Sequence, residues 1–207
     1  GEEVDRGELL PGAILTRVAK SHVRIGTFEY FKGKKDLDSI NILADYVIKR
    51  HYTELSESVN PYLSLLDSVM DRHAFLIARW LQVGFIHGVM NTDNASIVGE
   101  TLDYGPCAFM DEYSNAKYFS SIDRVGRYAY GNQARIGLWN VIQFAETLIP
   151  LIDSNEDSAN KKVMGVLAGF EIKFHQYWLN GMRQKMGLYT EHPSDEALID
   201  SLLKLME

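Results

Sequence analysis

The feature that most constrains the fold is a long apolar stripe at helical spacing. From about Pro61 to Val83, apolar side chains recur at steps of three and four residues, which is the spacing along one face of an α-helix. The stripe consists of Tyr62, Leu65, Leu66, Val69, Met70, His73, Leu76, Ile77 and Trp80. We therefore predict one long helix here. His73 falls on its apolar face, so we expect a hydrogen-bonded core histidine rather than a ligand.

Further patterns predict a mostly helical chain with a few strands at its front. Helical periodicity covers about residues 133–149, 161–184 and 194–206. A shorter apolar stripe is formed by Ile40, Ala44, Val47 and Ile48. Residues 13–25 alternate β-branched and polar side chains, which predicts one or two short strands. Residues 84–105 break the helical pattern and predict a loop followed by a tight hairpin of two short strands. Together these elements are typical of an α+β chain.

Composition and charge argue against several classes of protein. The chain has 207 residues, 46% of them apolar, and a net charge of −7, whereas a nucleic-acid binder usually has a basic stripe. No run of about 18 apolar residues is present, so no transmembrane helix is expected. The single cysteine, Cys107, excludes an internal disulfide and fits a reducing compartment. We expect no nucleic-acid or membrane partner, and a cytoplasmic location (mitochondrial if the chain is eukaryotic).

The break in the helical pattern contains the residues that indicate chemistry. His87 and Asn94 have the separation found in the kinase-like loop His-x-Asp-x-x-x-x-Asn, and Asp103-Tyr104-Gly105 takes the place of the metal-binding Asp-Phe-Gly that follows it. A carboxylate and an amide oxygen can share Mg²⁺ with phosphates and water. The predicted hairpin would bring Asn94 and Asp103 to the same ion. Each residue alone has a structural explanation, but their order favours a functional site.

One position departs from the kinase pattern. Val89 stands where a kinase has its catalytic aspartate, and a valine can neither accept a proton nor orient a hydroxyl. Asp93, next to the asparagine, offers a carboxylate close by, so general-base work could have moved there. Taken alone, Asp93 could instead cap a helix or turn, and His87 could support the loop backbone.

Three long segments are similar to the SelO family of protein adenylyltransferases, which includes bacterial YdiU. They are PGAILTRVAKSHVRIGTFEYF at 11–31, HGVMNTDNASIVGETLDYGPCAFMDEY at 87–113 and GRYAYGNQARIGLWNVIQFAETLIPLI at 126–152. The resemblance implies a protein-kinase-like C-lobe with a short β segment and a catalytic-loop hairpin. It also implies ATP bound in a flipped orientation and AMP transfer to Ser, Thr or Tyr hydroxyls of proteins. Some bacterial members are described as transferring UMP with Mn²⁺.

The same resemblance implies roles for five residues. Asp93 matches the proton acceptor, Asn94 and Asp103 match the metal ligands, and Asp103 also lies near the nucleotide. Arg17 and Arg24 match the arginines that bind the nucleotide phosphates. The implied cofactor is Mg²⁺ or Mn²⁺, and the implied substrate is ATP, with UTP as a second donor. From the residues alone, the favoured interpretation is that one or both arginines are solvent-facing strand residues.

The resemblance also implies parts that these residues do not contain. No Gly-rich phosphate loop, no N-lobe lysine with its glutamate and no C-terminal extension with a redox-active cysteine or selenocysteine is found in the sequence. We therefore expect residues 1–207 to be a single kinase-like core fragment, mostly C-lobe. A complete natural protein of this sequence would be a degenerate member.

Three other functions compete with adenylyl transfer. A catalytically inactive, pseudokinase-type nucleotide-binding module would explain Val89, but it has no need of a metal pair at Asn94 and Asp103. An aminoglycoside-type kinase requires an aspartate at position 89. A purely structural helical domain leaves the loop and hairpin unexplained. We therefore rank protein adenylyl transfer first and the inactive module second.

Overall fold

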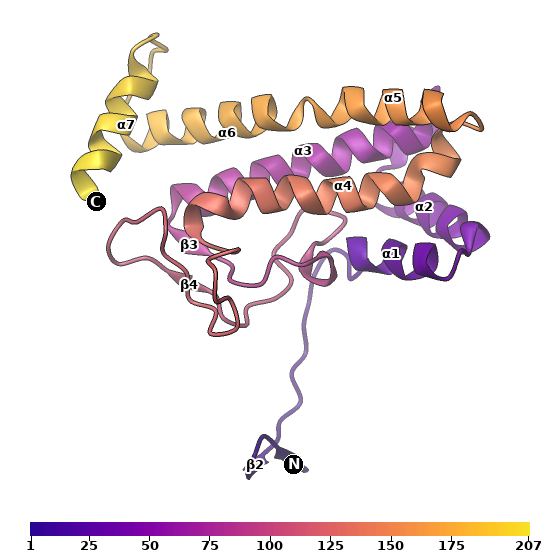
Figure 1. The fold of residues 1–207 in the computed structure, drawn as a ribbon, viewed down its shortest axis with the longest axis horizontal. Helices are drawn as coiled ribbons and strands as arrows, with labels where there is room; N and C mark the ends of the chain where they lie inside the picture. The colour runs from indigo at the N-terminus through magenta and orange to yellow at the C-terminus, as the bar shows by residue number, and fades with distance from the viewer.

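Long helices form the body of the molecule, which a computed structural model describes over all of residues 1–207 (Figure 1). The helices are α1 (Ile25–Gly33), α2 (Leu37–His51), α3 (Pro61–Gln82), α4 (Gln133–Ile152), α5 (Glu156–Leu167), α6 (Phe170–Lys185) and α7 (Asp195–Met206). α3 packs against both α4 and α6, and α1 packs against α4 and α2. α7 packs against α6 at the end of the molecule away from α2. The chain is therefore mostly helical, as predicted.

The strands are few and short. β1 (Glu3–Asp5) and β2 (Leu9–Pro11) form one antiparallel pair, and β3 (Phe85–Ile86) and β4 (Ala108–Phe109) form another. The 3₁₀ helices are η1 (Thr53–Glu57), η2 (Thr92–Asn94) and η3 (Tyr130–Asn132). The β1–β2 hairpin stands away from the helices at the end of an extended segment (Figure 1). The α+β class is confirmed, with most of the β structure outside the predicted positions.

Local chemistry fixes where α3 begins. The side chain of Asn60 accepts a hydrogen bond from the Leu63 N–H at 3.0 Å, and Pro61 occupies the first turn, where its missing N–H costs nothing. The predicted apolar face is buried in the main core, with Leu65 and Met70 fully inaccessible to solvent. The long helix is confirmed to within one residue of its predicted end.

His73 lies on this buried face, as predicted. Its side chain is 4% exposed, and Nε2 lies 2.9 Å from the carbonyl oxygen of Ser96, which can only accept. Nε2 therefore carries the proton. Because burial penalises the charged ring, the pKa of His73 is lowered from its ordinary value near 6.5 to about 4.

The predicted strand over residues 13–25 is wrong for most of its length. Ile14, Leu15 and Val18 are 97%, 85% and 90% exposed, and the segment from Gly12 to Lys20 contains no strand. Alternation favours a strand only where another strand supplies hydrogen bonds, and no segment of the chain pairs with these residues. Only the end of the segment, at Arg24, forms a bridge, to Ser96.

Two other boundaries differ from the prediction. The hairpin after the loop is reduced to a single bridge between Ala95 and Thr101, closed by a turn with Gly99 at φ +67°. The helix predicted over 161–184 is two helices, α5 and α6, separated at Ala168 and Gly169. Glycine in a helix interior costs about 1 kcal/mol relative to alanine, which favours a break at this position.

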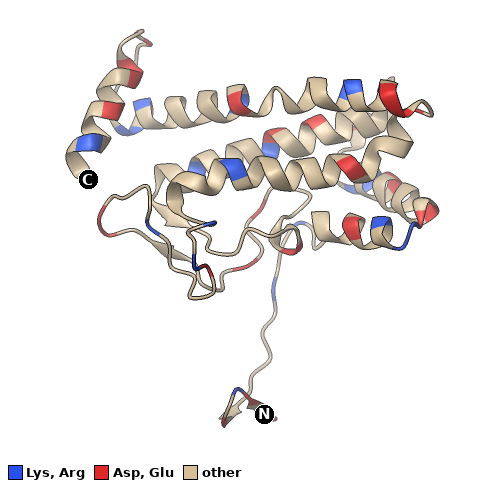
Figure 2. Cartoon of the chain, in the orientation of Figure 1, with Lys and Arg blue, Asp and Glu red and all other residues tan.

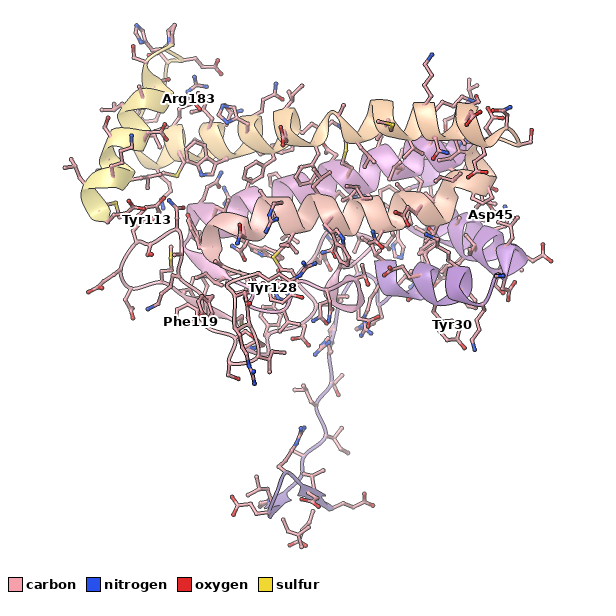
Figure 3. The ribbon with its side chains drawn as sticks, in the orientation of Figure 1. Tyr30, Asp45, Tyr113, Phe119, Tyr128 and Arg183 are labelled. Carbon is pink, nitrogen blue, oxygen red and sulfur yellow. The ribbon has the colours of Figure 1, made fainter.

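A long irregular segment, residues 110–129, connects β4 to η3 and lies below α4; Tyr128 marks its end in Figure 3. Asp123 organises this segment, because its two carboxylate oxygens accept the N–H groups of Arg127 and Tyr128, both at 2.8 Å. The guanidinium of Arg127 lies over the ring of Trp139 on α4, 5.0 Å from its centroid. These contacts attach the segment to the helical body.

Charge is spread over the molecule. Acidic and basic residues both occur along the helices (Figure 2). None of the helices has both the length and the apolar character needed to cross a membrane.

His73 should make the stability of the protein fall in mild acid. Unfolded His73 takes up a proton as pH falls through about 6.5, whereas the folded residue resists until about 4, so stability is present at neutral pH and is lost between these values. From about pH 7.5 to about pH 5, this group should cost about 2 kcal/mol. Urea unfolding of wild type and His73→Gln at both pH values measures it. An equal pH dependence in the two proteins would contradict the prediction.

Candidate functional site

A short antiparallel pairing joins the front of the chain to the loop predicted to be functional. The N–H of Ile25 donates to the Ala95 carbonyl at 2.9 Å, and the N–H of Ile97 donates to the Val23 carbonyl at 3.0 Å. Arg24 bridges Ser96 between these two bonds. Because α1 begins at Ile25, the pairing places the start of α1 beside η2, and the two elements are in contact.

Asp93 lies against this helix start. A Cβ atom added to Gly26 would be 2.2 Å from Oδ1 of Asp93 and 3.2 Å from its Cα, so only glycine allows this approach. The N-terminus of a helix has a partial positive charge that favours a carboxylate. Asp93 is also exposed, so a substrate hydroxyl could reach it. The predicted proton acceptor is therefore held in place and accessible.

The amide of Asn94 has a defined orientation. Nδ2 donates to the Val89 carbonyl at 2.9 Å, and the backbone N–H donates to Oδ1 of Asn91 at 3.1 Å. Because a carbonyl can only accept, the nitrogen must face Val89. Oδ1 of Asn94 then points elsewhere and accepts no hydrogen bond within the protein. An amide oxygen free of donors is what a metal ligand requires.

Asp103 is paired with Arg17. Oδ1 of Asp103 accepts the N–H of Gly105 at 2.9 Å, and Oδ2 lies 3.5 Å from a terminal nitrogen of Arg17. The Arg17 side chain is 38% exposed, and such surface pairs contribute little to stability. The structure thus brings these two predicted residues together, with Arg17 coming from the extended segment rather than a strand.

Arg24 is half-buried at the start of α1. Its Nε is buried and has no hydrogen-bond partner, although a guanidinium normally uses its N–H groups in pairs. A phosphate oxygen is the type of group that would satisfy this donor. Arg24 and Asp93 therefore lie at one helix end, whereas Arg17 and Asp103 form a separate ion pair.

His87 has a structural role in the loop, as its position suggested. The ring is buried, and Nδ1 accepts the N–H of Val89 at 3.3 Å. Burial lowers the pKa of His87, while the nearby negative charge of Asp103 raises it by a smaller amount. His87 lines the same small cavity as Asn94.

Two buried amides on α4 hold the loop, and sequence reasoning missed both. Gln133 accepts the N–H of His87 at 3.0 Å through Oε1 and donates to the Phe85 carbonyl at 2.9 Å through Nε2. Asn140, seven residues later on α4, donates to the Met90 carbonyl at 3.2 Å. The available signal was a pair of uncharged polar residues on the otherwise apolar face of a predicted helix.

The site's donors fit a magnesium or manganese ion that also binds a nucleotide. No group of three or more His, Cys, Asp or Glu side chains in the chain could hold a metal alone. Asn94 and Asp103 supply one amide oxygen and one carboxylate, which are hard ligands. Phosphate and water oxygens would have to complete the coordination, as they commonly do for Mg²⁺.

Comparison with known proteins identifies the family of the chain. The family described as "Protein adenylyltransferase SelO" matches residues 1–207. The chain therefore belongs to the SelO family. A protein of Rhizobium rhizogenes named "Protein nucleotidyltransferase YdiU" is 58% identical over 207 residues, which cover 100% of this chain and 41% of that protein. The proteins of the same name from Shouchella clausii and Bradyrhizobium diazoefficiens are 54% and 55% identical over 206 residues, or 42% of their length.

The chain thus spans about two fifths of the length of these relatives. Within that span, the structure places the start of α1 against η2 of the 87–94 loop and pairs Asp103 with Arg17.

Gly26→Ala should test the close approach of Asp93 to α1. The new methyl group would overlap Asp93, and overpacking of this kind costs about 1–3 kcal/mol. Gly33→Ala is the matched control: Gly33 ends the same helix and has no atom within 4 Å of an added Cβ. Chemical unfolding should show a loss of stability for Gly26→Ala only. Equal stability in the two variants would mean that α1 can move away from the loop.

Proposed function

We propose that the full-length protein containing this chain is a protein adenylyltransferase. It transfers AMP from ATP, with Mg²⁺ or Mn²⁺, to Ser, Thr or Tyr hydroxyls of proteins, and UTP is a second donor. The chain supplies a kinase-like C-lobe in which ATP is bound in the flipped orientation. Family membership supports nucleotidyl transfer in general, and the site residues support the finer proposal.

The observation that carries the proposal is the orientation of Asn94 beside an accessible Asp93. The Asn94 amide nitrogen is tied to the Val89 carbonyl, so its oxygen remains available to a cation. The neighbouring carboxylate of Asp93 is exposed and rests on the helix start at Gly26. A loop with only a structural role would not require an Asn94 amide oxygen without a hydrogen-bond donor, or an exposed Asp93 carboxylate beside it.

In the proposed reaction, the substrate hydroxyl oxygen attacks the α-phosphorus of ATP and the bond to pyrophosphate breaks. Asp93 accepts the hydroxyl proton, and pyrophosphate leaves with the electron pair of the broken bond. A divalent ion held by Asn94 and Asp103 would supply positive charge to the phosphates when bound. Arg24, through its unpaired Nε, and Arg17 bind phosphate oxygens and orient the nucleotide.

Val89 does not prevent this chemistry. Its N–H and carbonyl are both used within the loop, by His87 and Asn94, so the residue at position 89 acts through its backbone. A side chain that cannot take a proton is acceptable there because Asp93 offers a carboxylate four residues later. An inactive nucleotide-binding module is the competing function, and labelling experiments distinguish the two.

Labelled ATP tests which bond is broken. Full-length protein is incubated with Mg²⁺ or Mn²⁺, a mixture of cell proteins as acceptors, and ATP labelled at the α- or the γ-phosphate. We expect protein labelling from the α-position only, and none with Asp103→Asn, which removes the anionic ligand. Labelling from the γ-position would indicate a kinase instead. No labelling from either position would favour the inactive module.

Asp93→Asn should abolish proton acceptance without disturbing the contact at Gly26. A positioned general base contributes about 10²–10⁴-fold to rate, so α-label transfer should fall by that factor. Asp157→Asn is the control, because Asp157 is an exposed aspartate in the first turn of α5. Its transfer rate should equal that of wild type. Activity of Asp93→Asn within a few-fold of wild type would assign the base to another group.

A further inference from the structure

A small cavity lined by polar and apolar side chains lies among α3, the 87–100 segment and α4. Its volume is about 10 Å³, and its lining includes His87, Asn94 and Asn140. Two buried polar atoms of these residues have no hydrogen-bond partner, namely Nε2 of His87 and Oδ1 of Asn140. His87 is 1% exposed and Asn140 is 2% exposed. Unpaired polar atoms at this depth are costly, so their presence on one cavity calls for a physical explanation.

The other hydrogen bonds of His87 and Asn140 define what each unpaired atom needs. Nδ1 of His87 accepts the N–H of Val89, so the neutral ring carries its proton on Nε2, which is a donor. Nδ2 of Asn140 donates to the Met90 carbonyl, so Oδ1 is an acceptor. The cavity is therefore lined by one residue with an unpaired donor and one with an unpaired acceptor. One water molecule needs about this volume and at least two polar partners, and it can accept from one group and donate to the other.

These contacts lead directly to the predicted metal ligand. Asn140 holds the carbonyl of Met90, and the preceding carbonyl, that of Val89, receives Nδ2 of Asn94. The direction of the Val89 carbonyl sets which way the Asn94 amide turns. If the loop backbone rotated at Val89 and Met90, the Asn94 amide would rotate with it, and the free oxygen of Asn94 would change position.

We propose that Asn140 is a positioning residue for the metal site. It fixes the loop directly at Met90 and through one buried water at His87, and so keeps Oδ1 of Asn94 aimed at the ion. The role rests on the proposed function, because it assigns a purpose to Asn94 as a ligand. Asn140 itself touches neither nucleotide nor metal.

Asn140→Leu tests the role, because leucine is similar in size but has no polar atoms. Thr147→Val is the matched control: Thr147 is 1% exposed on the same helix, and its hydroxyl bonds only the Phe144 carbonyl of α4 itself. Both variants lose a buried hydrogen-bonding group, and only the first loses contact with the loop. Asn140→Asp, which keeps the shape but removes the donor to Met90, replaces Asn140→Leu if the latter does not fold.

Two measurements on the full-length protein are decisive. The first is Mn²⁺ binding, followed by electron paramagnetic resonance with a non-hydrolysable ATP analogue. Loss of a group that supports a metal ligand typically weakens metal binding about 10–100-fold, so we expect that loss for Asn140→Leu and no change for Thr147→Val. The second is amide hydrogen exchange of residues 89–94 in metal-free protein, which should be faster in Asn140→Leu alone.

The outcomes separate this inference from the proposed function. Equal Mn²⁺ affinity and equal exchange in the two variants would reduce Asn140 to an ordinary core residue and overturn the inference. Wild-type protein that binds no Mn²⁺ would instead contradict the proposed function. In that case Asn140 could not position a metal ligand, and faster exchange in Asn140→Leu would show only that Asn140 holds the loop.

Discussion

The site depends on one short antiparallel pairing, between residues 23–25 and 95–97. Its two backbone hydrogen bonds, at 2.9 and 3.0 Å, connect segments that lie about seventy residues apart in the sequence. This pairing holds the start of α1 beside η2 and so places the N-terminus of the helix against Asp93. The pairing also buries Ile25 and Ile97 completely, so its hydrogen bonds are shielded from water and join the main core. A pairing of only three residues on each side thus fixes the relative position of two segments that are distant in the sequence.

The helices position the loop through neutral groups rather than charges. Gln133 and Asn140 bond to loop backbone at Phe85, His87 and Met90, and all three contacts are buried. Amides can be buried at a modest cost once they are paired, whereas a buried charge requires a partner of opposite sign. Of the charged residues that the proposed reaction uses, Asp93 and Arg17 lie at the surface, whereas Asp103 and Arg24 are partly buried. The support beneath the loop is therefore neutral, and the charged groups lie at or near the surface.

Periodicity predicted the parts of the fold that depend on local burial, and it was less informative elsewhere. The stripe from Pro61 places α3 because each turn of that helix meets the core, and His73 was recognised from the same pattern. The alternation in residues 13–25 was misleading, because a strand needs a partner that sequence order does not reveal. The order of His87, Asn94 and Asp103 is what indicates the candidate site, since the residue types themselves limit the chemistry. The amides of α4 could not be assigned, because an uncharged polar residue on a helix gives no sign of what it will face.

The backbone bonds of Val89 explain why the loop tolerates a change in the kinase pattern. The N–H of this residue is bound by the His87 ring and its carbonyl by the Asn94 amide, at 3.3 and 2.9 Å. Neither bond involves the side chain, so neither bond depends on a valine at this position. Under the proposed function, the proton acceptor is free to occupy another position, provided that a helix start or a similar feature holds it. Asp93 meets that condition through Gly26, where only a residue without Cβ lets the carboxylate come so close.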